Sequence, residues 1–169
     1  LQTARLTLRP VAASDEAVVV ACLNDLAVTG WLAVVPYPHT PADFRQFQTE
    51  IAKPGETFAV EDDQGLAGIV GAGAELGYWF APRVHGRGYA TEAARAVLAM
   101  QFAHDPGAVA SGYFEGNTRS ANVLRKLGFT ETGRWTKHCR ALGQDRPHVE
   151  LLLTSEAFFA ANPLEIRTD

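Results

Sequence analysis

The sequence has little cysteine, no long apolar run and no excess of positive charge. Its two cysteines, Cys22 and Cys139, lie far apart and form no CxxC pair, so neither a disulfide scaffold nor a zinc site is expected. No apolar run approaches the roughly 20 residues needed to span a bilayer, and the first residues lack the basic and apolar stretches of a secretion signal. These absences predict a cytoplasmic protein with no membrane partner.

The charge balance also limits the partners. A formal net charge of −4 argues against nucleic acid as the main partner, because phosphate backbones attract basic surfaces. His138 and His148 lack the spacing of metal ligands, so no metal is expected. The sequence does have an apolar content of 47% over 169 residues, which predicts one globular domain spanning residues 1–169.

Hydrophobic periodicity and turn residues divide the chain into short strands and helices. A series of hairpins comes first, and a strand–helix–strand–helix stretch follows, which together predict an α+β domain with a mixed sheet. Strands are expected at residues 5–9, 57–61, 66–72, 74–80, 109–115, 135–140 and 148–153, and helices at 14–24, 43–52, 90–104 and 120–127.

The densest signal is the glycine loop of residues 83–93, between an expected strand and the clearest expected helix. Gly86 and Gly88 permit backbone conformations that other residues avoid. The first N–H groups of the helix have no internal partner, and with the helix dipole they attract an anion. The loop therefore predicts a pyrophosphate site, to which Arg83 and Arg87 would add positive charge.

Other phosphate motifs do not match this loop. Thr91 stands where the dinucleotide fingerprint has its third glycine, and no Gly-Lys-Ser/Thr follows as in a Walker loop. Taken alone, the loop is equally well explained as a glycine turn before a helix. The segments around it decide between the two interpretations.

Five segments in order resemble the GNAT superfamily of acetyltransferases, in particular the branch that includes the ribosomal-protein N-terminal (Rim-type) acetyltransferases. The resemblance runs from Arg5 to about Leu153. It rests on Thr3–Pro10, on Glu75–Trp79, on Arg83–Gly88 as the Q/R-x-x-G-x-G/A coenzyme A loop, on Gly88–Ala93, and on Asn117–Asn122 followed by Leu127–Phe129.

The resemblance implies a central, mostly antiparallel mixed sheet that is splayed where two parallel strands part and is flanked by helices. Acetyl-coenzyme A would lie in the gap as co-substrate, with its pyrophosphate on the loop and its pantetheine arm paired with the backbone of Trp79 and Phe80. The residues that this resemblance places around the coenzyme are Trp79, Phe80, Arg83, His85, Gly86, Arg87, Gly88, Tyr89, Ala90, Asn117 and Asn122.

The resemblance further implies that the acceptor amine attacks the thioester directly, in a ternary complex. Glu75 is the candidate base, with a solvated strand glutamate as the alternative. Ser120 is the candidate that steadies the leaving thiolate, although helix capping explains Asn117 and Ser120 equally well. Many relatives use a tyrosine after this helix, but here Phe129 takes that place.

The acceptor is predicted to be a primary amine, in particular a protein N-terminus. At pH 7 about one α-amine in six is neutral, against about one lysine amine in 2,500, so an α-amine needs a weaker base. A small-molecule acetyltransferase acting on an amino acid, polyamine or antibiotic is the alternative, and a polycation would require a cluster of carboxylates. A coenzyme A-binding module without turnover also remains as an alternative hypothesis. A homodimer is expected as well, because relatives in this family often form dimers.

Overall fold

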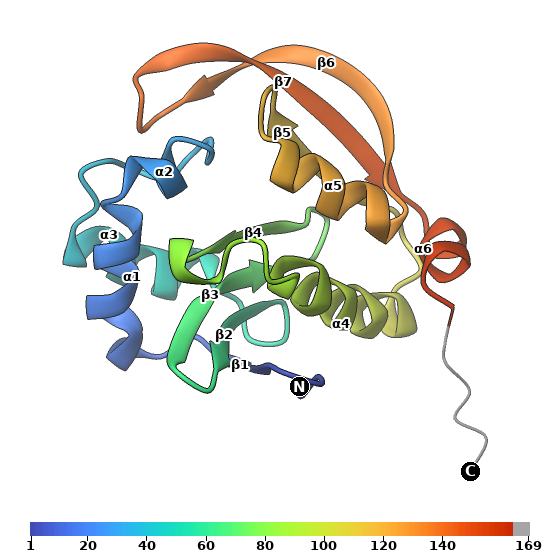
Figure 1. Cartoon of the computed structure of the whole chain (residues 1–169), viewed down its shortest axis with the longest axis horizontal. Helices are drawn as coiled ribbons and strands as arrows, with labels where there is room; N and C mark the ends of the chain where they lie inside the picture. Colours follow the sequence, from blue (N-terminus) through green and yellow to red (C-terminus); the bar gives the residue numbers. More distant parts are fainter. Residues whose placement is uncertain (164–169) are drawn as a thin grey trace.

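The computed structural model describes residues 1–163. Residues 164–169 of the predicted single domain lie outside the described part. The strands form two antiparallel sheets, and the long hairpin of the second sheet arches over the rest of the molecule (Figure 1). In spatial order the first sheet holds β1 (Thr7–Pro10), β2 (Thr57–Asp62), β3 (Gly65–Gly71) and β4 (Gly77–Phe80), and the second holds β5 (Val109–Phe114), β7 (Gln144–Leu153) and β6 (Thr130–Cys139).

The two sheets meet at one point, between the start of β4 and the start of β5. Glu75 and Ala110 form a parallel bridge there, in which Leu76 N donates to Ala110 O at 2.8 Å and Ala110 N donates to Ala74 O at 2.9 Å. The chain then diverges, because Gly77–Phe80 pair with β3 instead. The predicted strand at 74–80 therefore serves both sheets, and the predicted splayed, mixed sheet is confirmed.

Helices cover the two sides of this junction (Figure 1). On one side lie α1 (Glu16–Leu23), which follows a 3-10 turn at Ala13–Asp15, then α2 (Leu26–Thr29) and α3 (Pro41–Gln46), which continues into a π-helical turn at Phe47–Ile51. On the other side lie α4 (Tyr89–His104), α5 (Thr118–Leu127) and α6 (Ser155–Ala161). A second 3-10 turn at Pro82–Val84 links β4 to the glycine loop.

The core is divided in the same way. The larger cluster of buried apolar side chains packs α4 and α5 against both sheets, through residues such as Leu98, Leu124 and Val149. A smaller cluster around Phe44 packs α1 and α3 against β3. No helix of the described residues is long and apolar enough to cross a membrane.

Among the elements that differ from the predictions are α2 (Leu26–Thr29), which was not predicted, and β7, which begins at Gln144 instead of at 148. α6 follows a Thr154 cap and was not predicted. β6 begins at Thr130, five positions earlier than expected, because most of its side chains are exposed and leave no apolar alternation to read. The helix expected at 43–52 begins at Pro41, where Thr40 and Asp43 form a reciprocal capping box.

Candidate active site

A cleft of about 1190 Å³ follows the splay between the sheets. At one end it reaches the glycine loop and the first residues of α4, including Gly86, Tyr89 and Ala90. At the other end it is lined by the segment between α2 and α3, including Trp31 and Val35. The N-terminal turn of α5 borders it in the middle. This arrangement gives the molecule one continuous channel with two chemically different ends.

The glycine loop has the backbone geometry that an anion site requires. Gly86 and Gly88 have φ angles of 78° and 79°, in the left-handed region that favours glycine. The first donor within α4 is the amide of Glu92, which donates to Gly88 O at 3.1 Å. The amides of Tyr89 to Thr91 therefore precede the helical ladder and are available to a ligand at the positive end of the helix dipole.

The N-terminal segment forms hydrogen bonds with the loop and with the first turn of α4. The sequence did not indicate these contacts. Arg5 donates from Nη1 to Arg87 O at 2.8 Å and from Nε to Glu92 Oε2 at 2.7 Å. Thr3 Oγ1 also donates to Glu92 Oε1, at 2.6 Å. These contacts hold the Glu92 carboxylate on the outer side of α4. The positive charge of Arg5 there offsets the negative charge of Glu92, which would otherwise repel an anion on the loop.

The two arginines of the loop motif have different surroundings. Arg83 turns toward the β2–β3 hairpin, where it binds the Asp62 carboxylate at 2.8 and 3.0 Å and donates to Leu66 O at 3.0 Å. The pKa of Asp62 is lowered chiefly by this hydrogen bond. Arg87 is exposed and stands over the Tyr89 ring at 5.2 Å. The contacts of Arg83 thus stabilise a turn, and do not fit the expectation that its charge serves the anion site.

His85 lies inside the loop and links it to two neighbours. Its Nε2 is 2.8 Å from Phe80 O, and its Nδ1 is 2.7 Å from Arg119 Nη1. Because Arg119 can only donate, the neutral ring with its proton on Nε2 satisfies both contacts. The resemblance placed His85 only among the residues around the coenzyme, whereas in the structure its side chain also links the loop to the end of β4 and to α5.

The register of β4 decides which backbone groups face the cleft. Ala81 N donates to Ala67 O at 2.8 Å, and antiparallel pairing alternates with a period of two residues. The N–H and C=O of Trp79 therefore point toward Ile69 of β3, and those of Tyr78 and Phe80 point toward the open edge. The pairing expected for a pantetheine arm thus has the N–H and C=O of Tyr78 and the N–H of Phe80 available, because Phe80 O already faces His85 Nε2. Trp79 is not available, and its side chain packs on the smaller core cluster.

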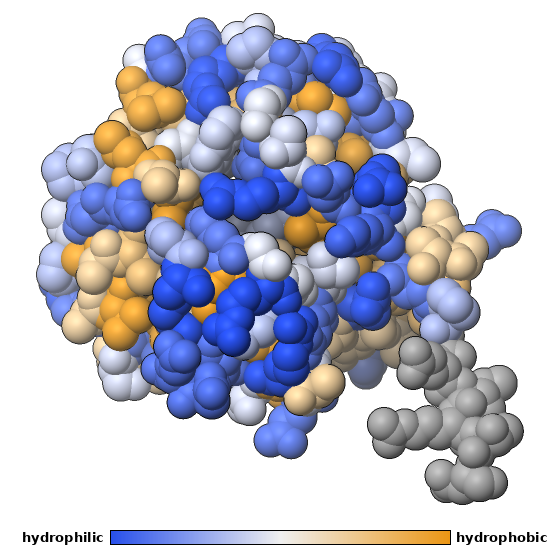
Figure 2. All heavy atoms as spheres, in the orientation of Figure 1, coloured by the Kyte–Doolittle hydropathy of each residue, from blue (hydrophilic) through white to orange (hydrophobic). Residues whose placement is uncertain are grey.

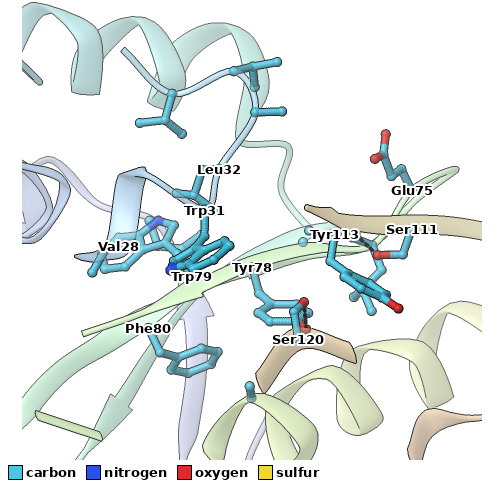
Figure 3. A pocket seen from close by; sticks show the side chains of 18 of the residues that line it. Val28, Trp31, Leu32, Glu75, Tyr78, Trp79, Phe80, Ser111, Tyr113 and Ser120 are labelled. Atoms are coloured by element: carbon cyan, nitrogen blue, oxygen red, sulfur yellow. Dashed lines mark hydrogen bonds between the residues drawn. The ribbon is translucent and has the colours of Figure 1, made fainter. Parts of the chain in front are cut away.

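Polar groups at the start of α5 face the same edge. Asn117 caps the helix, since its Oδ1 accepts from Ser120 N at 3.2 Å. The Ser120 hydroxyl is 2.8 Å from the Tyr78 hydroxyl (Figure 3). Asn122, the next predicted contact, is exposed at the rim of the cleft. The capping alternative is what the structure shows for Asn117, and Ser120 makes an additional contact that capping does not explain.

Comparison with known proteins agrees with this geometry. The sequence profile of the acetyltransferase (GNAT) domain matches residues 5–130. The chain belongs to the GNAT acetyltransferase family. It is therefore an acetyl-coenzyme A-dependent N-acetyltransferase, whose acceptor bears an amine. No curated protein sequence matches.

Solved structures similar to this GNAT chain share its fold at low identity. RimJ from Mycobacterium smegmatis in complex with CoA-disulfide is 24% identical, with a TM-score of 0.75 over 89% of this chain and 82% of that one. Spermidine N-acetyltransferase from Vibrio cholerae in complex with CoA and spermine is 19% identical, with a TM-score of 0.78 over 93% and 99%. Ribosomal-protein-alanine N-acetyltransferase from Brucella melitensis is 17% identical, with a TM-score of 0.73 over 88% and 99%.

The protonation of Tyr78 limits what the Tyr78–Ser120 pair could do for a leaving thiolate in a GNAT enzyme. Burial raises the pKa of Tyr78 to about 12, although the hydrogen bond with Ser120 opposes this shift. An ordinary thiol has a pKa of about 8.5, so full proton transfer from Tyr78 to a leaving thiolate would be uphill by roughly three to four units, or about 5 kcal/mol. The pair is suited to stabilise a thiolate by donating a hydrogen bond, and unsuited to protonate it.

Glu75, the predicted base, stands at the bridge between the sheets. Its side chain is exposed, lines the cleft, and points away from the Tyr78–Ser120 pair (Figure 3). Within the described residues its carboxylate forms no ion pair or hydrogen bond, and no cluster of acidic, histidine or cysteine side chains could hold a metal ion. Glu75 is thus an unpartnered negative charge on the acceptor side of the splay.

Proposed function

We propose that this GNAT enzyme acetylates the α-amine of a polypeptide N-terminus, as the Rim-type resemblance of the sequence suggests. The observation that carries the proposal is the carboxylate of Glu75, which lines the cleft and has no hydrogen-bond or ion-pair partner among residues 1–163. One carboxylate matches an acceptor with one ammonium group. A polyamine carries several, and each would have to find a partner or stay in water.

Each of the other carboxylates that line the cleft has a hydrogen-bond or ion-pair partner, although only Glu56 has a cationic one. Asp43 accepts from the hydroxyl and the amide of Thr40 at the start of α3, at 2.7 and 2.8 Å. Glu50 accepts from Gln46 Nε2 at 3.0 Å, and Glu56 lies 3.9 Å from Lys53 Nζ. Lys137 and Arg140 also line the cleft. These positive charges disfavour a polycation beside Glu75.

The wall opposite the second sheet favours an apolar part of the substrate. The segment between α2 and α3 presents Trp31, Leu32 and Val35 to the cleft, and Val34 at its mouth is 73% exposed. Apolar residues also gather at the edge of the molecule near α1 and α2 (Figure 2). An open channel with an apolar wall suits the first side chains of a peptide, whose remaining chain can leave through the mouth.

In this proposal Glu75 attracts the ammonium form of the acceptor to the thioester, and Ser120 donates a hydrogen bond to the thiolate that leaves. The coenzyme's pyrophosphate binds the amides at the start of α4, and its pantetheine arm pairs with the open edge of β4. Arg87, Asn122 and the loop glycines contact the coenzyme. Acetyl-coenzyme A supplies the acyl group, and no metal takes part.

The test is an acceptor screen that measures thiol release from acetyl-coenzyme A. Hexapeptides with a free N-terminus and a small or apolar first residue are compared with the same peptides blocked at the N-terminus and carrying one lysine. Spermidine and free amino acids complete the set. We expect turnover with the free peptides, and mass spectrometry should place the acetyl group on the α-amine. Turnover of spermidine or of lysine side chains alone would contradict the proposal.

A small monoamine is the second candidate, because it also carries a single charge. The same screen separates the two, since the proposal requires kcat/KM to rise when an amino acid is extended to a tripeptide. A constant kcat/KM across that series would favour the small molecule.

A further inference from the structure

The imidazole of His148, on β7, is a buried titratable group that the coenzyme site leaves unused. The residue is 5% exposed and lines the cleft. It pairs with Phe114 of β5 and with Trp135 of β6, and the Phe114 ring packs against it edge-on at 5.0 Å. These three strands hold the imidazole on the face of the second sheet that borders the acceptor side.

Gly112 of β5 makes room for this ring. A Cβ atom at Gly112 would overlap Cε1 of His148 and would lie 3.1 Å from its Nε2. Gly112 also lines the cleft, directly after Ser111, whose hydroxyl donates to Leu76 O at 2.9 Å across the sheet junction. The missing side chain therefore brings the imidazole close to the backbone at the point where the two sheets part.

The two nitrogens of His148 have different surroundings. Nδ1 lies 3.0 Å from Glu150 Oε1, at an angle that makes no hydrogen bond in this rotamer. Nδ1 is the fully buried nitrogen without a hydrogen bond, whereas Nε2, which also makes no hydrogen bond with residues 1–163, is not fully buried. A neutral imidazole with its proton on Nδ1, facing Glu150, keeps the lone pair of Nε2 open to a substrate.

The charges around the ring come from three strands. Lys137 on β6 disfavours a positive imidazole, whereas Glu150 on β7 and Glu75 at the start of β4 favour it; β5 contributes no charged side chain, and Arg146 of β7 is turned to Gly30 O at 2.6 Å. Burial is the largest influence and lowers the pKa of His148 below its ordinary value of 6.5. The ring is therefore neutral at pH 7 and able to accept a proton.

We propose that His148 is the base that takes the proton of the acceptor ammonium, in place of Glu75. Nε2 accepts that proton, and the neutral amine attacks the thioester carbonyl carbon. The carbon–sulfur bond then breaks, and its electron pair leaves with sulfur. The second proton of the attacking nitrogen goes to the thiolate, and the imidazolium, stabilised by Glu150, returns its proton to water. The products are the amide, free coenzyme A and one proton.

The proposal rests on transfer to a primary amine in this cleft and holds for any acceptor class. The ordinary pKa of an imidazole lies about two units above that of a glutamate carboxylate and closer to that of an α-amine, near 7.8. Burial of His148 reduces this difference. General-base assistance typically contributes about 10²–10⁴ in rate. The structure thus divides two tasks between two groups, since Glu75 attracts the ammonium and His148 removes its proton.

The experiment compares the pH dependence of kcat/KM for the wild type and for His148→Gln, with whichever primary amine is turned over. At pH 7 we expect His148→Gln to lose about 100-fold in kcat/KM, and at pH 9, where the amine deprotonates by itself, less than about tenfold. The wild-type acid limb that His148 sets, below pH 6.5, should be replaced in His148→Gln by a decline that follows protonation of the amine itself. Calorimetric affinity for coenzyme A should not change, which shows that the donor site is intact.

His138→Gln is the matched control, because His138 lies on the same hairpin, exposed and bound to Asp145 at 2.7 Å. It should retain wild-type kcat/KM at every pH. A second measurement adds free imidazole to His148→Ala. The added imidazole should replace the missing base and restore turnover at pH 7. An equal loss at all pH values for His148→Gln, with no rescue of His148→Ala by imidazole, would overturn the proposal.

Glu75→Gln separates the two candidate bases in the same profiles. If it removes the acid limb while His148→Gln keeps it, Glu75 is the base and the proposal is wrong. If only small amines are turned over and the His148 profiles behave as expected, the acceptor proposal fails while the role of His148 stands.

Discussion

The two ends of the cleft are built in opposite ways. The end proposed for the donor comes from one continuous stretch, in which β4 leads through Gly86 and Gly88 into α4, and it offers a ligand mostly backbone amides. The end proposed for the acceptor is assembled from Trp31, Glu75, Gly112 and His148, which come from four separate segments, and the groups proposed to act there are side chains. A contiguous backbone site leaves a motif in the sequence, whereas an assembled side-chain site does not.

The largest effect is expected at the donor end, from Gly88→Val. A branched side chain is strained at a φ of 79°, so the loop amides should lose their orientation, and affinity for coenzyme A should fall by about 100-fold or more. Calorimetry measures the affinity. Gly143→Val is the control, because Gly143 also has a positive φ, of 63°, but lies in the β6–β7 turn. Equal losses in both variants would show that the strain acts globally.

A smaller effect is expected from Tyr78→Phe, which removes the partner of Ser120. Hydrogen bonds to charged groups contribute about 1.5–3 kcal/mol, so kcat should fall by about tenfold or more while affinity for coenzyme A stays constant. Stopped-flow single turnover checks whether the chemical step has slowed. Ser120→Ala should add little to Tyr78→Phe in the double variant if the two hydroxyls act together.

Tyr113→Phe is the control for that prediction, since Tyr113 lines the same cleft without a hydrogen bond among the described residues. It should leave kcat unchanged. If kcat falls as much in Tyr113→Phe as in Tyr78→Phe, the loss in Tyr78→Phe does not come from its contact with Ser120.

At the acceptor end, Glu75→Gln tests attraction of the ammonium. A charge about 4 Å away in water contributes roughly 1 kcal/mol, so KM for the amine should rise by about fivefold. Because the side chain is exposed, the difference should shrink as salt is raised from low to high concentration. Glu50→Gln, which alters another carboxylate of the cleft, should leave KM unchanged. A KM for Glu75→Gln that equals the wild-type value at low salt contradicts the role given to Glu75.

The smallest effect on binding is expected from Arg83→Gln. Its guanidinium is held by Asp62, so affinity for coenzyme A should not change, while the free energy of unfolding should fall by about 1 kcal/mol. Arg87→Gln is the comparison, and its affinity should fall severalfold if Arg87 alone supplies charge to the pyrophosphate. Titration calorimetry and urea unfolding measure the two quantities. If Arg83→Gln binds coenzyme A more weakly than the wild type, this prediction is wrong and Arg83 contributes to the anion site.

The sequence predicted the fold and the glycine loop because turn residues and helix starts are local features. It could not orient Arg83, since the partner Asp62 lies 21 positions earlier on another hairpin. It named Trp79 instead of Tyr78 beside the open edge, because which backbone groups face outward depends on the register with β3.

His148 shows the same limit more sharply. The sequence gives it no metal-ligand spacing, and its position over Gly112 follows only from the pairing of β5 with β7. A glycine within a predicted strand was the one available signal, since such residues mark places where another group approaches closely.

The single bridge between Glu75 and Ala110 has a consequence for dynamics. Past that bridge the outward amides of Tyr78 and Phe80 have no strand beside them among residues 1–163, so in the free enzyme they should exchange their hydrogens with solvent faster than those of β3. A bound pantetheine arm would slow that exchange and link two otherwise separately fluctuating halves. The coenzyme would then stabilise the arrangement of the two sheets in addition to reacting. Its release in each catalytic cycle would allow the two sheets to fluctuate separately again.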